Sequence, residues 1–389
     1  MASCDLKDFL GDAAYSTRAW TFQEYQLANR LLVFASNGHV YFRCSQAVCS
    51  EEVIAGGELE PDAAMLEGAR MIEVRPERLR LWSAYREAVQ AYTTRILSHQ
   101  EDIIDDFSGI LHTLYIGRCM EGIPRPIFDI AILWQPRERV YRRREFPSWA
   151  WAGWKGRVCW LENTHLESFF KNSSSETAAM NGWSKVSAWI VWHSSSRKNC
   201  QTQAFRSEGP PWFHGTAPSE KMQESRFPHR LGSISPTPTL MPDRLDRIKT
   251  HAQEFRYLQF WTISMRFRID LERTAVKRRS SLEPENTGNG LRRFIIFDTL
   301  GQSCGWVLLD EAWIEQVVSR KTHAQEFILL SEVSAGSESS AKSSVNNRRE
   351  YNAMMITWKD GIAERAGVGC IKTDADSIRN MTWREILLG

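Results

Sequence analysis

The sequence predicts an α+β protein, in which a short helical N-terminal portion packs with a largely antiparallel, β-rich C-terminal region that carries long polar loops. Two patterns predict this class. Apolar residues recur at helical spacing between residues 81 and 114, and beyond Pro147 they alternate with polar residues as in half-buried strands. At 389 residues the chain exceeds the roughly 250–300 residues at which one core stops growing, so one large or two modest domains are expected.

The helical portion is predicted from three segments. Residues 19–44 indicate a helix that leads into a hairpin, whose turn is Ser36-Asn37-Gly38. Residues 81–96 and 101–114 then predict two amphipathic helices that pack together. The second helix opens with acidic residues, which suit the positive end of its dipole.

The β-rich region is predicted from short runs of apolar and β-branched residues. The dipeptide Asp360-Gly361 is a strong signal for a tight hairpin after the last of these runs. Polar segments rich in Ser, Pro and Gly separate them and predict disordered loops. The strands are predicted at residues 261–269, 294–297, 306–309, 327–330 and 351–358, and the loops near 171–182, 194–247, 275–290 and 334–349.

The composition excludes several classes of partner and cofactor. A net charge of +2 predicts no nucleic-acid partner, and without any run of about 18 apolar residues the chain is expected to have no membrane span and to be cytoplasmic. Its eight cysteines form no CxxC pair, and the one close pair, Cys44 and Cys49, lacks a second pair to complete a metal site. No nucleotide or hydrolase motif occurs. We therefore expect no metal and no cofactor.

Tryptophan is the compositional outlier, with 16 residues. Tryptophan side chains can stabilise a hydrophobic core by packing within it, or they can form a binding surface. Trp149, Trp151 and Trp154 would form an aromatic platform for a sugar or a proline-rich peptide if they shared one face of a strand. The small neighbours Ala150 and Ala152 favour the alternative, in which the three rings are packed in the core.

The densest run of basic residues also has two interpretations, one structural and one functional. Without interleaved aromatic residues or a nucleic-acid-binding motif, a solvated loop is favoured over a phosphate-binding segment. The run consists of Arg137, Arg139, Arg142, Arg143 and Arg144.

Several segments carry motifs in a recognisable order. Residues 18–24 read R-A-W-T-F-Q-E, residues 146–154 read F-P-S-W-A-W-A-G-W, and residues 360–369 read D-G-I-A-E-R-A-G-V-G, which includes Arg365. Residues 92–97 and 105–111 carry further motif segments between them. Together they resemble the fungal heterokaryon-incompatibility (HET) domain family, whose upstream blocks are missing here.

The resemblance implies a truncated protein with a regulatory or scaffold role in fungal non-self recognition and programmed cell death signalling, and a protein partner. It divides the chain into a residual end of the HET domain at 1–50, a helical region at 51–135 and a β-rich region at 136–389. A nonfunctional fragment, with apolar surface exposed at residues 15–44, is an alternative.

The motif residues Arg18, Trp20, Gln23 and Glu24 are the best candidates for a polar ligand site, because an amide and a carboxylate lie beside an arginine. The favoured alternative is a helix in which Glu24 and Arg18 simply pair with neighbouring residues. The family's proposed likeness to TIR domains implies a further alternative, an NAD-cleaving enzyme with Glu24 as its acid. We expect no catalytic site in this chain.

Overall fold

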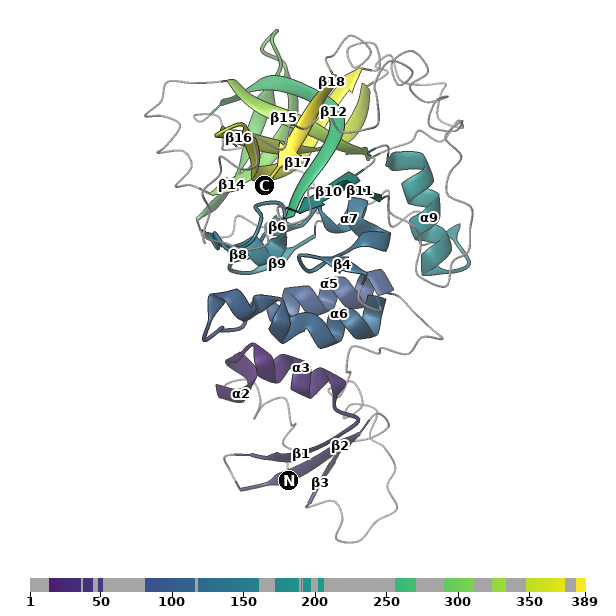
Figure 1. The fold of residues 1–389 in the computed structure, drawn as a ribbon, viewed down its shortest axis with the longest axis vertical. Helices are drawn as coiled ribbons and strands as arrows, with labels where there is room; N and C mark the ends of the chain where they lie inside the picture. The colour runs from purple at the N-terminus through teal and green to yellow at the C-terminus, as the bar shows by residue number, and fades with distance from the viewer. Residues whose placement is uncertain are drawn as a thin grey trace. The chain divides into compact units, whose positions relative to one another are not determined.

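The computed structural model describes residues 14–35, 38–44, 48–51, 81–115, 118–160, 172–188, 190, 192–196, 202–205, 256–270, 290–310, 324–333, 348–374 and 383–389. These residues form two compact units, one up to Gly117 and one from Arg118 onward, and each unit is described by itself. The predicted α+β class is confirmed (Figure 1). No helix in the described ranges is both long and apolar enough to cross a membrane.

The first unit combines short helices with one small antiparallel sheet. The predicted helix followed by a hairpin is confirmed as α3, β1 and β2, although Ser36 and Asn37 of its turn lie outside the described residues. The elements are α2 (Ala14–Thr17), α3 (Trp20–Leu27), β1 (Arg30–Phe34), β2 (Val40–Cys44), β3 (Val48–Ser50), α5 (Leu81–Tyr92), the 3-10 turns η3 (Gln100–Ile103) and η4 (Asp105–Phe107), and α6 (Ser108–Tyr115).

Aromatic side chains hold this unit together. The ring of Phe22 on α3 lies 5.8 Å from that of Tyr92 and 6.4 Å from that of Phe107, and the latter two rings are 4.7 Å apart. The Tyr92 hydroxyl donates to the carbonyl of Ile103 at 3.0 Å, so its polar end is satisfied inside the core. Residues from the predicted regions 1–50 and 51–135 therefore share one core, while those two boundaries remain predictions.

The two long helices are shorter than predicted. The first ends at Tyr92, where the hydroxyls of Thr93 and Thr94 bond back to carbonyls of the preceding turn and compete with helix continuation. Ile96 is exposed beyond that end, and its backbone pairs with Thr17 and Ala19 instead. The predicted second helix is α-helical only from Ser108, whose hydroxyl bonds the Asp105 carbonyl.

The second unit begins with short elements. The segment predicted as a loop at 171–182 turns helical from Glu176, which corrects that prediction. The elements are β4 (Cys119–Met120), β5 (Ile123–Pro124), η5 (Arg125–Ile127), α7 (Phe128–Ala131), β6 (Gln135–Pro136), β7 (Tyr141–Arg142), η6 (Trp151–Gly153), β8 (Trp154–Lys155), β9 (Val158–Cys159) and α9 (Glu176–Ser187).

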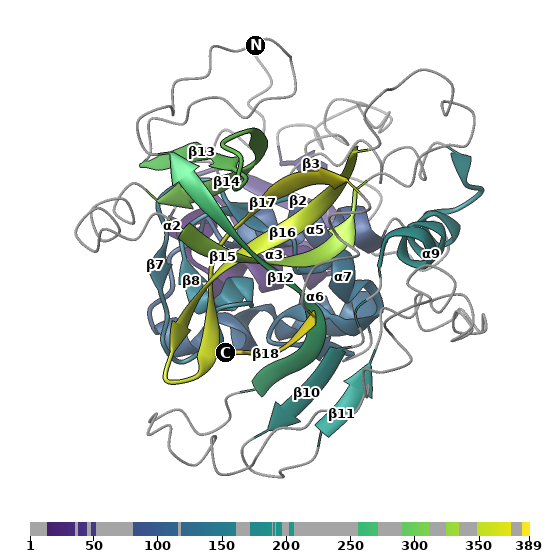
Figure 2. The same ribbon diagram turned by 90° about the horizontal axis from the view of Figure 1, so that it is seen from above.

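A nine-stranded, mostly antiparallel sheet follows (Figures 1 and 2). Pairing of β12 with both β13 and β15 closes the path β12–β13–β14–β17–β16–β15 into a ring. The other half of β12 pairs with β10 and β18. The strands are β10 (Trp192–Ser196), β11 (Thr202–Phe205), β12 (Arg256–Asp270), β13 (Leu291–Phe297), β14 (Ser303–Asp310), β15 (Ala324–Glu332), β16 (Arg348–Lys359), β17 (Ile362–Asp374) and β18 (Trp383–Leu388).

The predicted strands are all present within these elements. Along β12, Met265 and Phe267 are buried while Arg266 and Arg268 are exposed, as the alternation predicted. The predicted hairpin at Asp360-Gly361 joins β16 to β17, with φ of 52° and 82° at its two central residues, as a primed turn requires.

The loop predicted near 194–247 opens instead with strand residues, because β10 extends to Ser196 and β11 covers Thr202–Phe205. The rest of that segment lies outside the described residues, as do 275–289 and 334–347. Residues 348 and 349, at the end of the last predicted loop, belong to β16.

Candidate functional site

The four residues of the first motif, of which Trp20, Gln23 and Glu24 lie on α3 and Arg18 precedes it, do not converge on one point. Gln23 is a structural residue, since its side-chain oxygen accepts the backbone N–H of Gly109 at 2.8 Å near the start of α6. Glu24 and Arg18 are exposed, and the Arg18 guanidinium lies 5.9 Å from the ring of Trp20. Gln23 therefore binds the backbone of a distant segment, and the predicted pairing of Glu24 and Arg18 with neighbouring residues stays a prediction.

The most deeply buried charged side chain described in this unit belongs to a residue that was not predicted as a site residue from the sequence. Arg43 on β2 is only 1% exposed and places its guanidinium 3.9 Å from the ring of Tyr25. Its Nη1 donates to the Tyr25 carbonyl at 2.9 Å, while its Nε and Nη2 have no hydrogen-bond partner among the residues that the structure describes. Burial lowers the pKa of the Arg43 side chain, and Tyr25 and Tyr15 oppose that shift.

A second arginine lies on the same core. Arg95 has its guanidinium 4.7 Å from the ring of Phe22, and its Nη1 donates to the carbonyl of Arg18 at 2.9 Å. Burial lowers its pKa as well. Both guanidinium groups therefore bind carbonyls and aromatic faces, which makes them parts of the fold rather than groups poised for chemistry.

The tryptophan motif of the second unit is mostly core, as favoured. Trp149 and Trp151 are fully buried, and residues 151–153 form a 3-10 turn rather than a strand, so the three rings form no exposed platform. Trp154 is half-buried; its indole donates to the Ser148 carbonyl at 2.8 Å. Gly153 permits this turn, since a Cβ there would lie 2.3 Å from the Pro147 carbonyl oxygen.

Arg365 joins this motif to the one at 360–369. Its Nη1 donates to the Ile132 carbonyl at 2.9 Å, its Nη2 donates to the Trp134 carbonyl, and the guanidinium lies 3.6 Å from the Trp134 ring. Its backbone N–H donates to Ser148 Oγ at 2.8 Å, across 217 residues of sequence. The Ser148 hydroxyl in turn donates to the carbonyl of Gly389.

The three side chains of this contact are buried, with no more than 4% of any of them exposed. Arg365 lies in the core, and burial lowers its pKa well below the usual value. Its donors bind carbonyls, and the Ser148 hydroxyl both accepts and donates. The cluster, made of Trp134, Ser148 and Arg365, locks two distant segments together.

The basic run is not the solvated loop that was predicted. Arg137, Arg139 and Arg144 are exposed, but Arg143 is buried and donates to the Ala152 carbonyl at 3.3 Å. Arg142 donates to the Gly153 carbonyl at 2.8 Å. The Gly153 carbonyl also accepts the backbone N–H of Arg143 at 2.8 Å, so main-chain and side-chain bonds together join the turn at 150–153 to this part of the basic run.

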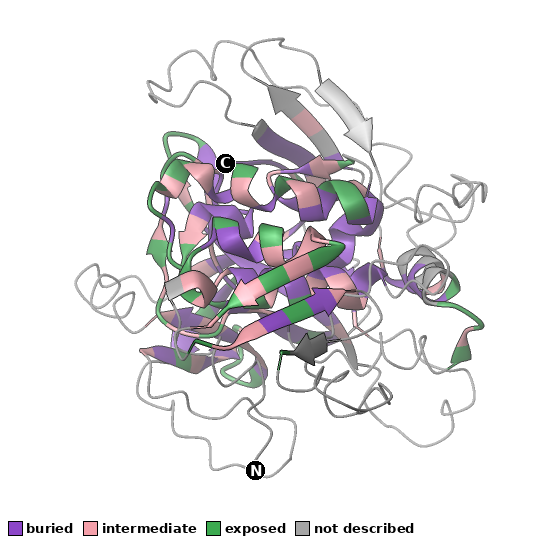
Figure 3. Ribbon diagram, turned by 90° about the horizontal axis from the view of Figure 1, so that it is seen from below, coloured by how far each residue is buried: buried purple, intermediate pink, exposed green. Residues whose placement is uncertain are grey.

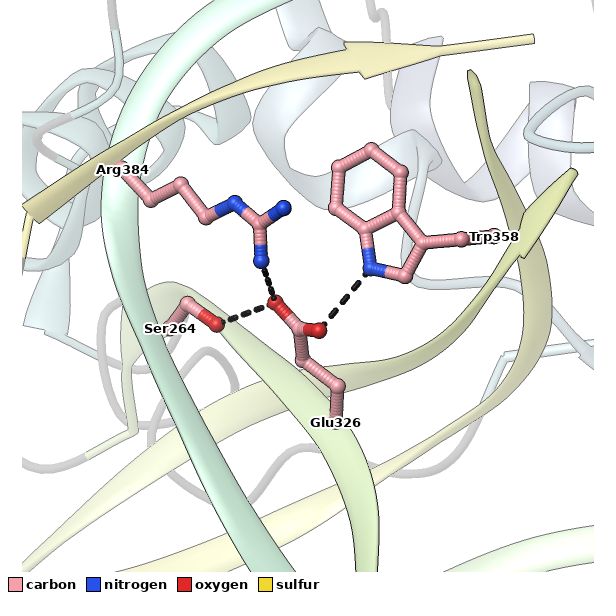
Figure 4. A network of polar contacts seen from close by, with 4 residues as sticks. All are labelled: Ser264, Glu326, Trp358 and Arg384. Carbon is pink, nitrogen blue, oxygen red and sulfur yellow. Dashed lines mark hydrogen bonds and ion pairs between the residues drawn. The ribbon is translucent and has the colours of Figure 1, made fainter. Parts of the chain in front are cut away.

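A polar network at the outside of the ring was also missed (Figure 4). Glu326 on β15 accepts from Ser264 Oγ at 2.6 Å and from Arg384 Nη1 at 2.8 Å on one oxygen, and from Trp358 Nε1 at 2.8 Å on the other. Arg384 also lies 4.3 Å from the Trp358 ring. Because both carboxylate oxygens are occupied, the network anchors β18 and offers no free base.

Within the described ranges, no three His, Cys, Asp or Glu side chains gather as metal ligands would. Cys44 is a half-buried free thiol on β2.

Comparison with known proteins gave no match to a family model, to a curated protein or to a solved structure.

Proposed function

We propose that this chain is a cytoplasmic HET-type protein that serves as a regulatory or scaffold module, with a protein partner, in fungal non-self recognition and cell death signalling. The observation that supports this proposal most is the contact between two motif segments. Ser148 of the tryptophan motif bonds Arg365 of the last motif, so residues named by the resemblance are those that build the second unit. A shared structural role of this kind is what a common fold would require.

The geometry favours association over catalysis. The candidate acid Glu24 is exposed and its neighbour Gln23 is committed to Gly109, whereas an acid for NAD cleavage needs a pocket and a positioned partner. By contrast, the sheet of the first unit exposes large apolar side chains on one face, Leu32, Phe34 and Phe42. Exposed apolar patches commonly mark protein interfaces.

The test is controlled overexpression in a filamentous fungus, with protein level monitored. We expect growth arrest from the wild-type chain and loss of arrest from Phe34→Asp, because a charge at this face opposes apolar contact. Leu300→Asp is the matched control: Leu300 is 82% exposed on the β13–β14 turn, and this variant is expected to arrest growth like wild type.

Wild-type protein that accumulates without slowing growth would overturn the proposed role. Purified protein incubated with NAD is expected to release no nicotinamide. Release that Glu24→Gln abolishes would instead establish the NAD-cleaving alternative.

A further inference from the structure

One face of the small sheet in the first unit is exposed to solvent and carries apolar side chains. On β1, exposed residues alternate with half-buried ones, and the exposed set is Arg30, Leu32 and Phe34 (Figure 3). Phe34 is 75% and Leu32 is 54% exposed, and Phe42 lies directly across from Leu32 on β2. The opposite face carries Tyr41 and Arg43, which are buried.

One edge of this sheet has no further strand beside it in the described residues. Among the described residues, β1 pairs only with β2. The Ala35 N–H donates to the His39 carbonyl at 2.9 Å, so in the antiparallel alternation Val33 and Leu31 point their backbone groups toward β2. The N–H and C=O groups of Arg30, Leu32 and Phe34 therefore point outward from the edge.

Natural edge strands are usually blunted by charged side chains, a proline or a bulge. The strand β1 carries a charge only at its first residue, Arg30, contains no proline, and pairs with β2 in a continuous register. The opposite edge strand, β3, spans only Val48–Ser50 and is protected by its shortness. Within the described part of this sheet, β1 is therefore the less protected of the two edges.

We propose that β1 pairs antiparallel with β1 of a second copy of this chain, about a two-fold axis at Leu32. In this register Leu32 faces Leu32 of the second copy, and Arg30 faces Phe34 of the second copy. In this register each outward N–H group of one copy lies opposite an outward C=O group of the other. This gives about six main-chain hydrogen bonds between the two β1 strands. A one-residue slip would oppose outward groups with groups already bonded to β2.

The side chains fit the same register. Arg30, Leu32 and Phe34 share a face, so each guanidinium comes to lie beside the phenylalanine of the other copy, and no like charges are opposed. An unrelated strand would need a matching sequence, whereas a second copy supplies it automatically. The contact is small, at the low end of specific interfaces, so the dimer is weak and depends on concentration.

This inference rests on strand geometry and does not depend on the proposed role in cell death. The first test is sedimentation velocity of the full chain over a wide concentration range. We expect a monomer–dimer equilibrium, weakened at least tenfold by Leu32→Pro. Because the Leu32 N–H points away from β2, proline removes an intermolecular donor and leaves the β1–β2 bonds in place.

A second variant tests the register directly. Residues in a hydrogen-bonded antiparallel pair have Cα atoms about 5.5 Å apart, within reach of a disulfide. Leu32→Cys is therefore expected to form a covalent dimer on mild oxidation, well above the wild-type level. Leu300→Cys, at a position that is even more exposed but lies in the other unit, is the control and should form no such dimer.

Monomeric wild-type protein at every concentration would overturn the proposal. So would dimerisation that Leu32→Pro leaves unchanged, or equal cross-linking of the two cysteine variants. A dimer without growth arrest would leave this inference standing and count only against the proposed signalling role.

Discussion

The two units treat the edges of their sheets in opposite ways. In the second unit, pairing of β12 with β13 and β15 closes the strands into a ring, and β18 adds a further partner along β12. In the described part of the first unit, β1 has one partner strand and keeps a row of outward backbone groups. Closure removes the hazard of edge pairing, and an open edge invites a partner.

The two units also differ in whether the donors of their buried arginine side chains are hydrogen-bonded. Arg365 has both its Nη1 and its Nη2 bonded to carbonyls, whereas Arg43 has an unpartnered Nε and Nη2. Buried donors without acceptors cost free energy, on the order of 1–3 kcal/mol each. The Arg43 side chain is thus held by aromatic packing at some cost in hydrogen bonding, whereas the Arg365 side chain is held by hydrogen bonds to carbonyls as well as by the Trp134 ring.

The largest expected effect comes from breaking that cluster. Arg365→Ala leaves the Ile132 and Trp134 carbonyls without a donor and opens a cavity beside the Trp134 ring, so the second unit should lose about 3–5 kcal/mol. Urea unfolding followed by tryptophan fluorescence measures it. Arg268→Ala, at an exposed position of β12, is the matched control and should stay within about 0.5 kcal/mol of wild type. Equal unfolding midpoints for the two variants would show that the cluster does not hold the unit.

A smaller effect is expected where two ring strands approach closely. A Cβ at Gly369 would lie 1.9 Å from the Trp306 carbonyl oxygen, so Gly369→Ala must push β14 and β17 apart, at a cost of about 1–3 kcal/mol. Native-state hydrogen exchange should show faster exchange of amides along this pair of strands.

The control for that variant is Gly361→Ala at the hairpin turn. Its Cβ would meet no atom within 4 Å, but φ is +82°, so it costs about 1 kcal/mol through backbone strain alone. Exchange in β14 should remain slow. If both alanine variants leave β14 equally protected, the close approach is not a constraint on the ring.

The rate at which cysteine thiols react should differ between the two units, and this measurement needs no substitution that alters stability. Burial raises the pKa of Cys119 and of Cys370 to about 12, so at pH 8 only roughly one in ten thousand of these thiols is ionised. Their alkylation by iodoacetamide should be very slow and should still increase with pH above 9. Half-buried Cys44, on the open sheet, should react first.

Peptide mass spectrometry after a short labelling pulse gives the three rates, and a pulse in denaturing urea shows that every thiol can react. Labelling of Cys370 as fast as Cys44 in the native protein would mean that the second unit opens as readily as the first.

Local patterns predicted much of this fold. The alternation from Trp261 to Ile269 and the Asp360-Gly361 signal are properties of neighbouring residues, and both correspond to observed elements. Closure of the ring is not such a property, because β12 pairs with β15 and β18 far along the chain. The helix ends were missed because threonine and serine hydroxyls, rather than apolar spacing, decided them.

The site residues show the same limit. Arg365 was named from its motif, but its role depends on Ser148 and Trp134, more than 200 residues away in sequence. Arg43 was missed because arginine is expected at the surface. One signal was present: Arg43 is two residues from Tyr41, and residues at that spacing share a face of a strand.

The dual pairing of β12 also has a consequence for synthesis of the protein. Gln259 bonds Glu385, which follows it by 126 residues, so at typical translation rates roughly 6–25 s pass before β18 has been made. During that interval the apolar stretch Leu258–Ile263 lacks the strand that covers it. A nascent chain stalled there would be a natural client for ribosome-associated chaperones.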